Sequence, residues 1–147
     1  MQPPPLATAF FDLGRDISQA WQRWFNLVAG NHKFVDRGDP STYDFTQAAL
    51  TTNGVWNDLN LSSIIPKGTV LVLIRASVSD ETVGLLLAFR KNGQKNTINA
   101  SQIRTQQVSM YNSSDMIVAC DNQRIIEYAA TNTTWTTIQI IVRGWWV

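Results

Sequence analysis

From about residue 42 to its end, the chain consists of short apolar stretches that alternate with turn signals. Asn-Gly, Pro-Lys-Gly and, at 112–115, Asn-Ser-Ser-Asp separate stretches rich in Val, Ile, Leu and Thr. About eight short strands at a spacing of about 8 to 12 residues are typical of an antiparallel β-sandwich or jelly roll. We therefore expect a mainly β domain over 42–147, with strands near 43–50, 55–61, 69–78, 83–90, 97–103, 105–110, 116–120, 124–129 and 135–142.

Two of these strands have patterns that predict how they are buried. The run from Val70 to Ile74 is apolar at every position, which indicates a strand that is covered on both faces. In contrast, Ile138, Ile140 and Val142 occur at every second position, as in a strand that is buried on one face. The sequence Arg-Gly-Trp-Trp-Val follows directly, so we expect this last strand to be paired inside a sheet.

The first part of the chain, 1–41, has a different pattern. Three prolines at 3–5 favour an extended tip. From 12 to 28, apolar residues recur at steps of three and four, which predicts one short amphipathic helix that ends at Ala-Gly-Asn. The candidate anchor and oligomerisation residues on its apolar stripe are Ile17, Trp21, Trp24, Phe25 and Val28.

Such a helix must bury its aromatic stripe, because a helix of this length is marginal alone and exposed Trp and Phe are costly. It could pack on its own β-domain, or on copies of itself or a host structure. A polar linker at 31–41, rich in charges and helix breakers, separates it from the strands and favours the second arrangement. We therefore expect an attachment segment at 1–41 and a separate β-domain at 42–147.

The composition argues against several partners. Charged residues make up only 16% of the chain and the net charge is +1, so no basic field for nucleic acid is expected. No apolar run reaches the roughly 20 residues that span a bilayer, so no membrane partner is expected either. One cysteine and the lack of a signal-peptide pattern predict a protein made and kept in a reducing cytoplasm.

Few residues are of the types that carry catalysis or bind metal. His32 is the only histidine and lies in the linker, and Cys120 follows an apolar run as a small buried residue would. Asp80 and Glu81 are adjacent, and adjacent residues on a strand would point to opposite faces, so joint acid–base catalysis is not expected. The pair is better interpreted as part of a solvated turn. No nucleophile elbow, dinucleotide motif or phosphate loop is present. We expect no enzyme, no metal and no cofactor.

Aromatic residues in the β-domain suggest a second possible function. A platform of exposed indole rings could stack on sugar rings, which would make the chain a glycan-binding module. The alternative is that these rings fill the core or a subunit interface. The four tryptophans concerned are Trp56, Trp135, Trp145 and Trp146.

Two sets of residues carry a resemblance to a known class of proteins. The N-terminal prolines and the run 20–27 resemble the start of many small virion proteins of tailed bacteriophages. The segment 61–68 with the apolar strand after it, the segment 89–93 and the closing Gly-Trp-Trp resemble small jelly-roll domains of phage capsid cement proteins, head fibres and tail appendages.

This resemblance implies a non-enzymatic virion protein that is assembled in the host cytoplasm. It implies a homotrimer that attaches through its N-terminal segment to the major capsid protein or another virion protein. Capsid decoration or cementing is the expected role, and a tail-fibre or adaptor module that binds a host receptor or glycan is the alternative. Trp145 and Trp146 are candidate interface residues in such a trimer.

Overall fold

The structure is a computed structural model that describes residues 33–147. The compact unit within it runs from Phe34 to Val147. The expected helix at 12–28 lies outside the described residues, as does His32. The same holds for the candidate anchor residues Ile17, Trp21, Trp24, Phe25 and Val28.

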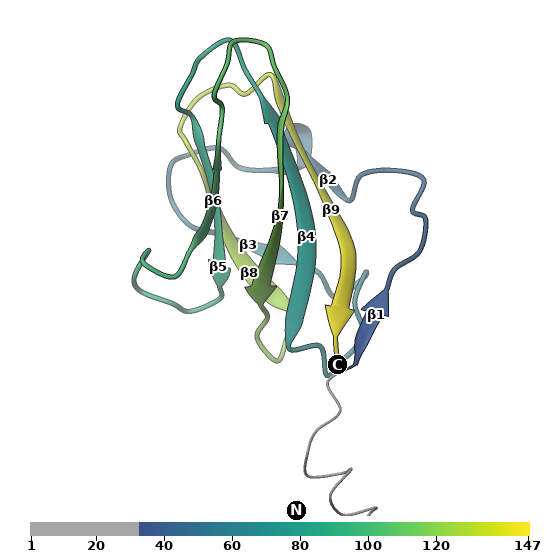
Figure 1. Cartoon of the computed structure of the whole chain (residues 1–147). Helices are drawn as coiled ribbons and strands as arrows, with labels where there is room; N and C mark the ends of the chain where they lie inside the picture. The colour runs from purple at the N-terminus through teal and green to yellow at the C-terminus, as the bar shows by residue number, and fades with distance from the viewer. Residues whose placement is uncertain (1–32) are drawn as a thin grey trace, which may run out of the picture. The chain divides into compact units, whose positions relative to one another are not determined.

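Within the described residues, nine strands form two antiparallel sheets (Figure 1). The five-stranded sheet has the order β1-β9-β4-β7, with β2 also paired to β9. Its strands are β1 (Phe34–Asp36), β2 (Phe45–Thr46), β4 (Leu71–Ser79), β7 (Asn112–Ala119) and β9 (Thr137–Trp146). The four-stranded sheet has the order β3-β8-β5-β6. Its strands are β3 (Asn57–Asn60), β5 (Leu86–Lys91), β6 (Ser101–Arg104) and β8 (Ile125–Ala130).

The strand pairs are nested along the chain. β5 pairs with β6, β4 with β7, β3 with β8 and β2 with β9, so each pair encloses the one before it. Successive nested pairs lie in alternate sheets. The pairs β4–β9 and β5–β8 then join the nested pairs side by side within each sheet. The chain therefore folds as one long antiparallel hairpin bent over into two layers.

The core lies between the two sheets and follows the strand alternation. In β4 the inward residues Val72, Ile74, Ala76 and Val78 are fully buried. The opposite layer contributes Leu87, Phe89, Ile126 and Tyr128. This two-sheet architecture confirms the expected mainly β domain with antiparallel pairing.

Several expected elements differ from the observed ones. The segment 105–110 is a loop and not a strand, and the polar run 112–115, expected as a turn, is the first half of β7. The stretch 43–50 forms only the short β2 followed by a 3-10 turn at Gln47–Ala49. Part of the expected linker is also structured, because Phe34–Asp36 is a strand that pairs with the end of β9.

Candidate functional site: the outer face of the five-stranded sheet

The solvent side of the five-stranded sheet carries the most distinctive surface among the described residues. We call it the outer sheet face. It is formed by the residues that alternate with the core residues of β4, β7 and β9, together with Phe34 from β1. Its members are Phe34, Leu71, Leu73, Arg75, Ser77, Ser113, Asp115, Ile117, Ile141, Arg143 and Trp146.

One end of the outer sheet face is apolar. Leu71 lies opposite Trp146 on one side, and Leu73 lies opposite Ile117 on the other. Ile117 is 54% exposed, whereas the two leucines are half-buried. A row of branched apolar side chains thus faces solvent on a strand whose other side already fills the core. Contiguous exposed apolar surface of this kind marks interaction sites more often than isolated exposed residues do.

An aromatic pair closes this apolar end. The rings of Phe34 and Trp146 lie with centroids 4.7 Å apart and planes inclined by 52°. The pair depends on Gly144, because a Cβ there would lie 2.4 Å from Phe34 Cζ and 2.6 Å from the Val35 carbonyl oxygen. Glycine therefore allows β1 to approach β9 closely enough for the Phe34 ring to cross over it.

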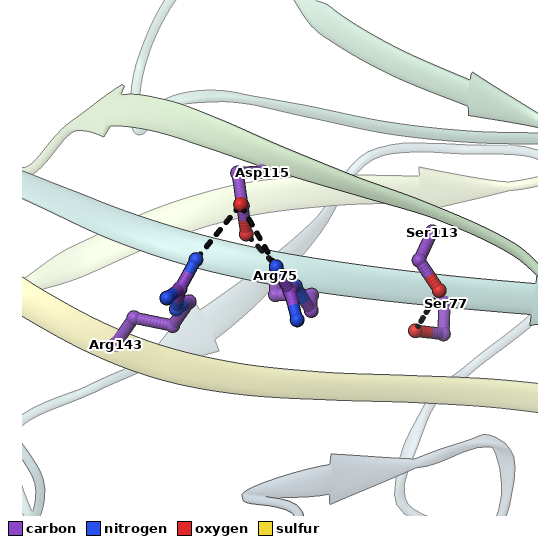
Figure 2. A network of polar contacts seen from close by, with 5 residues as sticks. All are labelled: Arg75, Ser77, Ser113, Asp115 and Arg143. Carbon is purple, nitrogen blue, oxygen red and sulfur yellow. Dashed lines mark hydrogen bonds and ion pairs between the residues drawn. The ribbon is translucent and has the colours of Figure 1, made fainter.

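The middle of the outer sheet face holds an ion network that spans three strands (Figure 2). Arg75 Nε donates to Asp115 Oδ1 over 3.0 Å, and Arg75 Nη2 donates to Oδ2 over 3.1 Å. Arg143 Nη1 donates to the same Oδ2 over 2.8 Å. One carboxylate thus accepts from two guanidinium groups. Further along β4, the hydroxyls of Ser77 and Ser113 lie 2.7 Å apart in a hydrogen bond.

The network affects the protonation of its members. The hydrogen bonds from Arg75 lower the pKa of the Asp115 carboxyl, while partial burial opposes this and Arg143 adds to it. The hydrogen bond to Asp115 in turn raises the pKa of Arg75. All three side chains are well exposed, so their ion pairs add little to the stability of one chain. Their fixed geometry matters more for what the face can contact.

A β-bulge brings Arg143 to this network. The register between β4 and β9 shifts at Leu73 and Ile74, which leaves Arg143 as the extra residue of β9. At the bulge, Asp44 Oδ2 accepts the Val142 N–H over 2.7 Å and Arg37 Nη1 donates to the Val142 carbonyl over 3.1 Å. The Arg37–Asp44 ion pair therefore supplies the hydrogen bonds that a neighbouring strand would make here.

The outer sheet face is hollowed beside the loop that joins β1 and β2. A groove of about 480 Å³ runs between this loop and β4, and Leu73, Arg75, Tyr43 and Arg143 are among its lining residues. A second groove of about 600 Å³ shares Pro40, Tyr43 and Ile141 with it. The two grooves thus adjoin; the first has a mixed lining that includes Asp36 and both guanidinium groups, and the second is mainly apolar.

The structure separates the tryptophans that the sequence grouped together. Trp145 and Trp146 are neighbours on β9, so they point to opposite sides: Trp145 packs against the core, and Trp146 lies on the outer sheet face. Trp135 is buried and donates from Nε1 to the Thr131 carbonyl. Trp56 covers the Arg90 guanidinium, whose carbon is 3.9 Å from the ring centroid. These rings do not form the sugar-stacking platform that the sequence suggested.

The other candidate residues have structural surroundings. Cys120 is buried as expected, and burial raises the pKa of its thiol to about 11, with Asp121 adding to the effect. Asp80 is buried, whereas Glu81 is exposed. Among residues 33–147, no three His, Cys, Asp or Glu side chains are placed to hold a metal ion. The same part of the chain contains no helix long and apolar enough to cross a membrane.

Most residues of the outer sheet face were missed as a site by sequence reasoning. Two signals pointed to it. Trp146 was a candidate interface residue, and the uniformly apolar run 70–74 indicated a strand covered on both sides. In a single chain only one of these sides is covered. Comparison with protein-family models finds no match for this sequence, and comparison with curated proteins finds none either.

Proposed function

We propose that this protein is a non-enzymatic structural component of a phage virion. In this proposal it is a homotrimeric jelly-roll module that decorates or cements the capsid, and its N-terminal segment attaches it to the major capsid protein or another virion protein. The fold supports the jelly-roll assignment, because nested antiparallel pairs distributed between two sheets are the arrangement of a double Greek key. Because jelly rolls have many functions, the proposed role rests on the surface of this domain and not on its fold.

The observation that carries the proposal is the uncovered apolar end of the outer sheet face. Leu71 and Leu73 belong to a strand whose sequence is apolar on both faces, yet one chain covers only the inner face. A second copy of the chain laid against this side would remove Leu71, Leu73 and Ile117 from water. At roughly 25 cal/mol per Å² of apolar surface, such burial favours association.

The polar part of the same face suits an interface between copies. The Arg75–Asp115–Arg143 network pairs one carboxylate with two guanidinium groups, so it keeps a net charge of +1 and leaves further N–H donors on both arginines. Arginine and aromatic residues are enriched in interfaces of this kind. The proposal that three copies associate comes from the resemblance of the sequence to phage virion proteins. Three weak attachment segments on one particle would then bind by avidity.

The assembly surface is tested by replacing Ile117 with arginine in the full-length chain. Wild-type protein should have the mass of a trimer by light scattering on a sizing column, and the Ile117→Arg variant should have the mass of a monomer. The reason is that a charge placed among Leu73 and its neighbours would be buried without a partner. Circular dichroism should be unchanged, because Ile117 is exposed in one chain.

Val55→Arg is the matched control, since Val55 is 57% exposed, close to the 54% of Ile117, and lies in the loop before β3 of the four-stranded sheet. It should leave the mass of the trimer unchanged. A monomeric wild type, or a trimer that persists in the Ile117→Arg variant, would contradict the assignment of this face.

The attachment role is tested by removing residues 1–30. Because the compact unit begins at Phe34, the shortened chain should fold and remain soluble. It should no longer bind capsids in a sedimentation assay, whereas the full-length chain should saturate them. If the shortened chain still decorates the particles at full occupancy, the N-terminal segment is not the anchor.

A further inference from the structure

The connections at one end of the two-sheet fold form a second distinctive surface. We call it the loop end. It consists of residues 105–111 between β6 and β7 and residues 80–85 between β4 and β5. Tyr111 is 63% exposed there, and Val83, Val108 and Met110 are also exposed. None of these side chains belongs to the outer sheet face, so the apolar exposure at the loop end needs its own explanation.

The loop end lies far from the point where the N-terminal segment joins the domain. Along β4, Leu71 lies opposite Trp146, which pairs with Phe34, whereas Val78 lies opposite Asn112. Seven residues of strand separate the two ends by about 23 Å. Figure 1 shows β1 and the C-terminus at one end and the β6–β7 connection at the other. A ligand at the loop end therefore leaves the β1 end free.

The loop end is held in one conformation by hydrogen bonds between its connections. The Ser109 N–H donates to the Asp80 carbonyl over 2.8 Å, with Ser109 in the left-handed region at φ 56°. The Thr105 hydroxyl donates to the Thr82 carbonyl over 2.8 Å and accepts the Leu85 N–H over 2.9 Å. Because the loops are fixed by these bonds, a ligand would meet a surface that is already ordered.

Two adjoining grooves with polar, almost uncharged linings begin at the loop end, and the second continues between β6 and β7. One, of about 400 Å³, is lined by Gln106, Gln107, Met110, Tyr111 and Asn112. The other, of about 440 Å³, shares Gln106 and Asn112 and adds Gln102, Ile103, Arg104, Ser113 and Ser114. Within 33–147, no acidic side chain lines either groove. Both volumes lie in the range of small-molecule sites, which is about 300 to 1,000 Å³.

The amide groups in these grooves are available to a ligand. No hydrogen bond among the described residues involves the side chain of Gln106 or Gln107. Asn112 Nδ2 donates to the Arg104 carbonyl over 2.8 Å, which fixes the amide and leaves its oxygen as an acceptor. Each free amide offers two donors and one acceptor oxygen, so the grooves can bond to a group that both donates and accepts.

We propose that the loop end binds carbohydrate, in the form of a neutral mono- or disaccharide unit. Sugar hydroxyls both donate and accept, which matches Gln106, Gln107 and Asn112. The apolar C–H faces of a sugar ring match the exposed ring of Tyr111 and the Met110 side chain beside it. Among the described residues that line these grooves, Arg104 is the one cation that a strongly anionic ligand would meet. The exposed Val83 and Val108 do not line the grooves, whose polar centre differs from the more apolar centre of a protein interface.

This binding site is tested by saturation-transfer difference NMR on the full-length protein. The probes are D-glucose, D-galactose, L-rhamnose and N-acetyl-D-glucosamine at millimolar concentration, followed by a printed array of neutral and acidic oligosaccharides. At least one neutral saccharide should receive saturation at its C–H protons. Tyr111→Ala should lower its affinity at least tenfold, and Gln106→Ala should lower it as well. Both positions are exposed, so both variants should fold.

Tyr43→Ala is the matched control, because Tyr43 is an exposed tyrosine beside the outer sheet face. It should leave saccharide binding unchanged. Binding to acidic saccharides alone, loss of binding in Tyr43→Ala, or no saccharide binding at all would overturn the inference. So would a Tyr111→Ala variant that loses attachment to capsids while wild type binds no sugar, since the loop end would then dock a protein.

These outcomes are separate from those of the proposed assembly. A trimer that binds no saccharide overturns the carbohydrate site and leaves the assembly surface intact. A monomer that binds saccharide through Tyr111 supports the site and overturns the trimer.

Discussion

Replacing Gly144 with alanine should lower the free energy of unfolding by about 2 to 3 kcal/mol and detach β1 from the sheet. The new Cβ would lie 2.4 Å from Phe34 Cζ and 2.6 Å from the carbonyl oxygen of Val35. The Phe34 ring can rotate away, but the carbonyl belongs to the backbone of the paired strand. β1 must therefore move, and the Phe34–Trp146 contact is lost with it.

Urea unfolding followed by tryptophan fluorescence measures the loss of stability, and hydrogen exchange locates it. The Arg37 N–H, which donates to the Arg143 carbonyl over 3.0 Å, should exchange much faster in the variant. The double variant Phe34→Ala with Gly144→Ala separates the two contacts. It should regain only the part of the lost stability that comes from the clash with the Phe34 ring. Unchanged stability together with unchanged exchange in Gly144→Ala would show that β1 does not depend on this close approach.

This contact also shows why β1 could not be predicted from its own sequence. Phe34–Asp36 lies between charges and helix breakers, and local patterns there indicate a linker. The strand exists because its partner, the end of β9, lies more than a hundred residues away in the sequence. The hydrogen bonds of Arg37 and Asp44 with Val142 at the β9 bulge also join residues that lie far apart in the sequence. No window of neighbouring residues contains that information.

The first half of β7 was missed for a related reason. Asn, Ser and Asp at 112–115 are typical turn residues, because their side chains compete for backbone hydrogen bonds. In the structure their side chains bond across the sheet instead, Ser113 to Ser77 and Asp115 to Arg75. Cross-strand pairs of this kind stabilise a strand that its own composition does not favour. The Arg75–Asp115–Arg143 network could therefore not be predicted from the sequence.

The opposite error occurred at 105–110, where apolar residues suggested a strand. Val108 and Met110 do alternate with polar residues, but they are exposed in a loop. The left-handed conformation of Ser109 between them is incompatible with a strand. Local alternation did predict the one buried face of β9, where Ile138, Ile140 and Val142 are fully buried. These inward residues bury enough apolar surface to decide the register.

Replacing Asp80 with asparagine should lower the free energy of unfolding by about 2 to 3 kcal/mol at neutral pH. Asp80 is only 6% exposed. One carboxylate oxygen accepts the Thr82 N–H and the other accepts the Thr136 N–H, each over 2.8 Å. Asparagine has one acceptor oxygen, so one of these two donors would lose its partner. The connections β4–β5 and β8–β9 would then no longer be tied together by this side chain.

The stability difference between wild type and Asp80→Asn should depend on pH. Burial by itself would raise the pKa of the Asp80 carboxyl, but the hydrogen bonds from Thr136 and Thr82 lower it overall. A carboxyl with a lowered folded pKa stabilises the protein fully above its unfolded pKa of about 3.9. That stabilisation is lost as the pH falls through the folded value. The gap between wild type and Asp80→Asn should therefore be widest near pH 7 and narrow below about pH 4.

Glu81→Gln is the matched control, because it removes the same charge from the adjacent, exposed position. Its unfolding free energy should stay within about 0.5 kcal/mol of wild type at every pH. Equal losses in both variants would mean that net charge, and not the buried hydrogen bonds, decides the acid stability. A constant gap for Asp80→Asn across the pH range would show that folding does not lower the pKa of the Asp80 carboxyl. The carbonyl of Asp80 also anchors Ser109. The Asp80→Asn substitution leaves that backbone bond in place. The folded variant should therefore still bind saccharide at the loop end, although it is less stable than wild type.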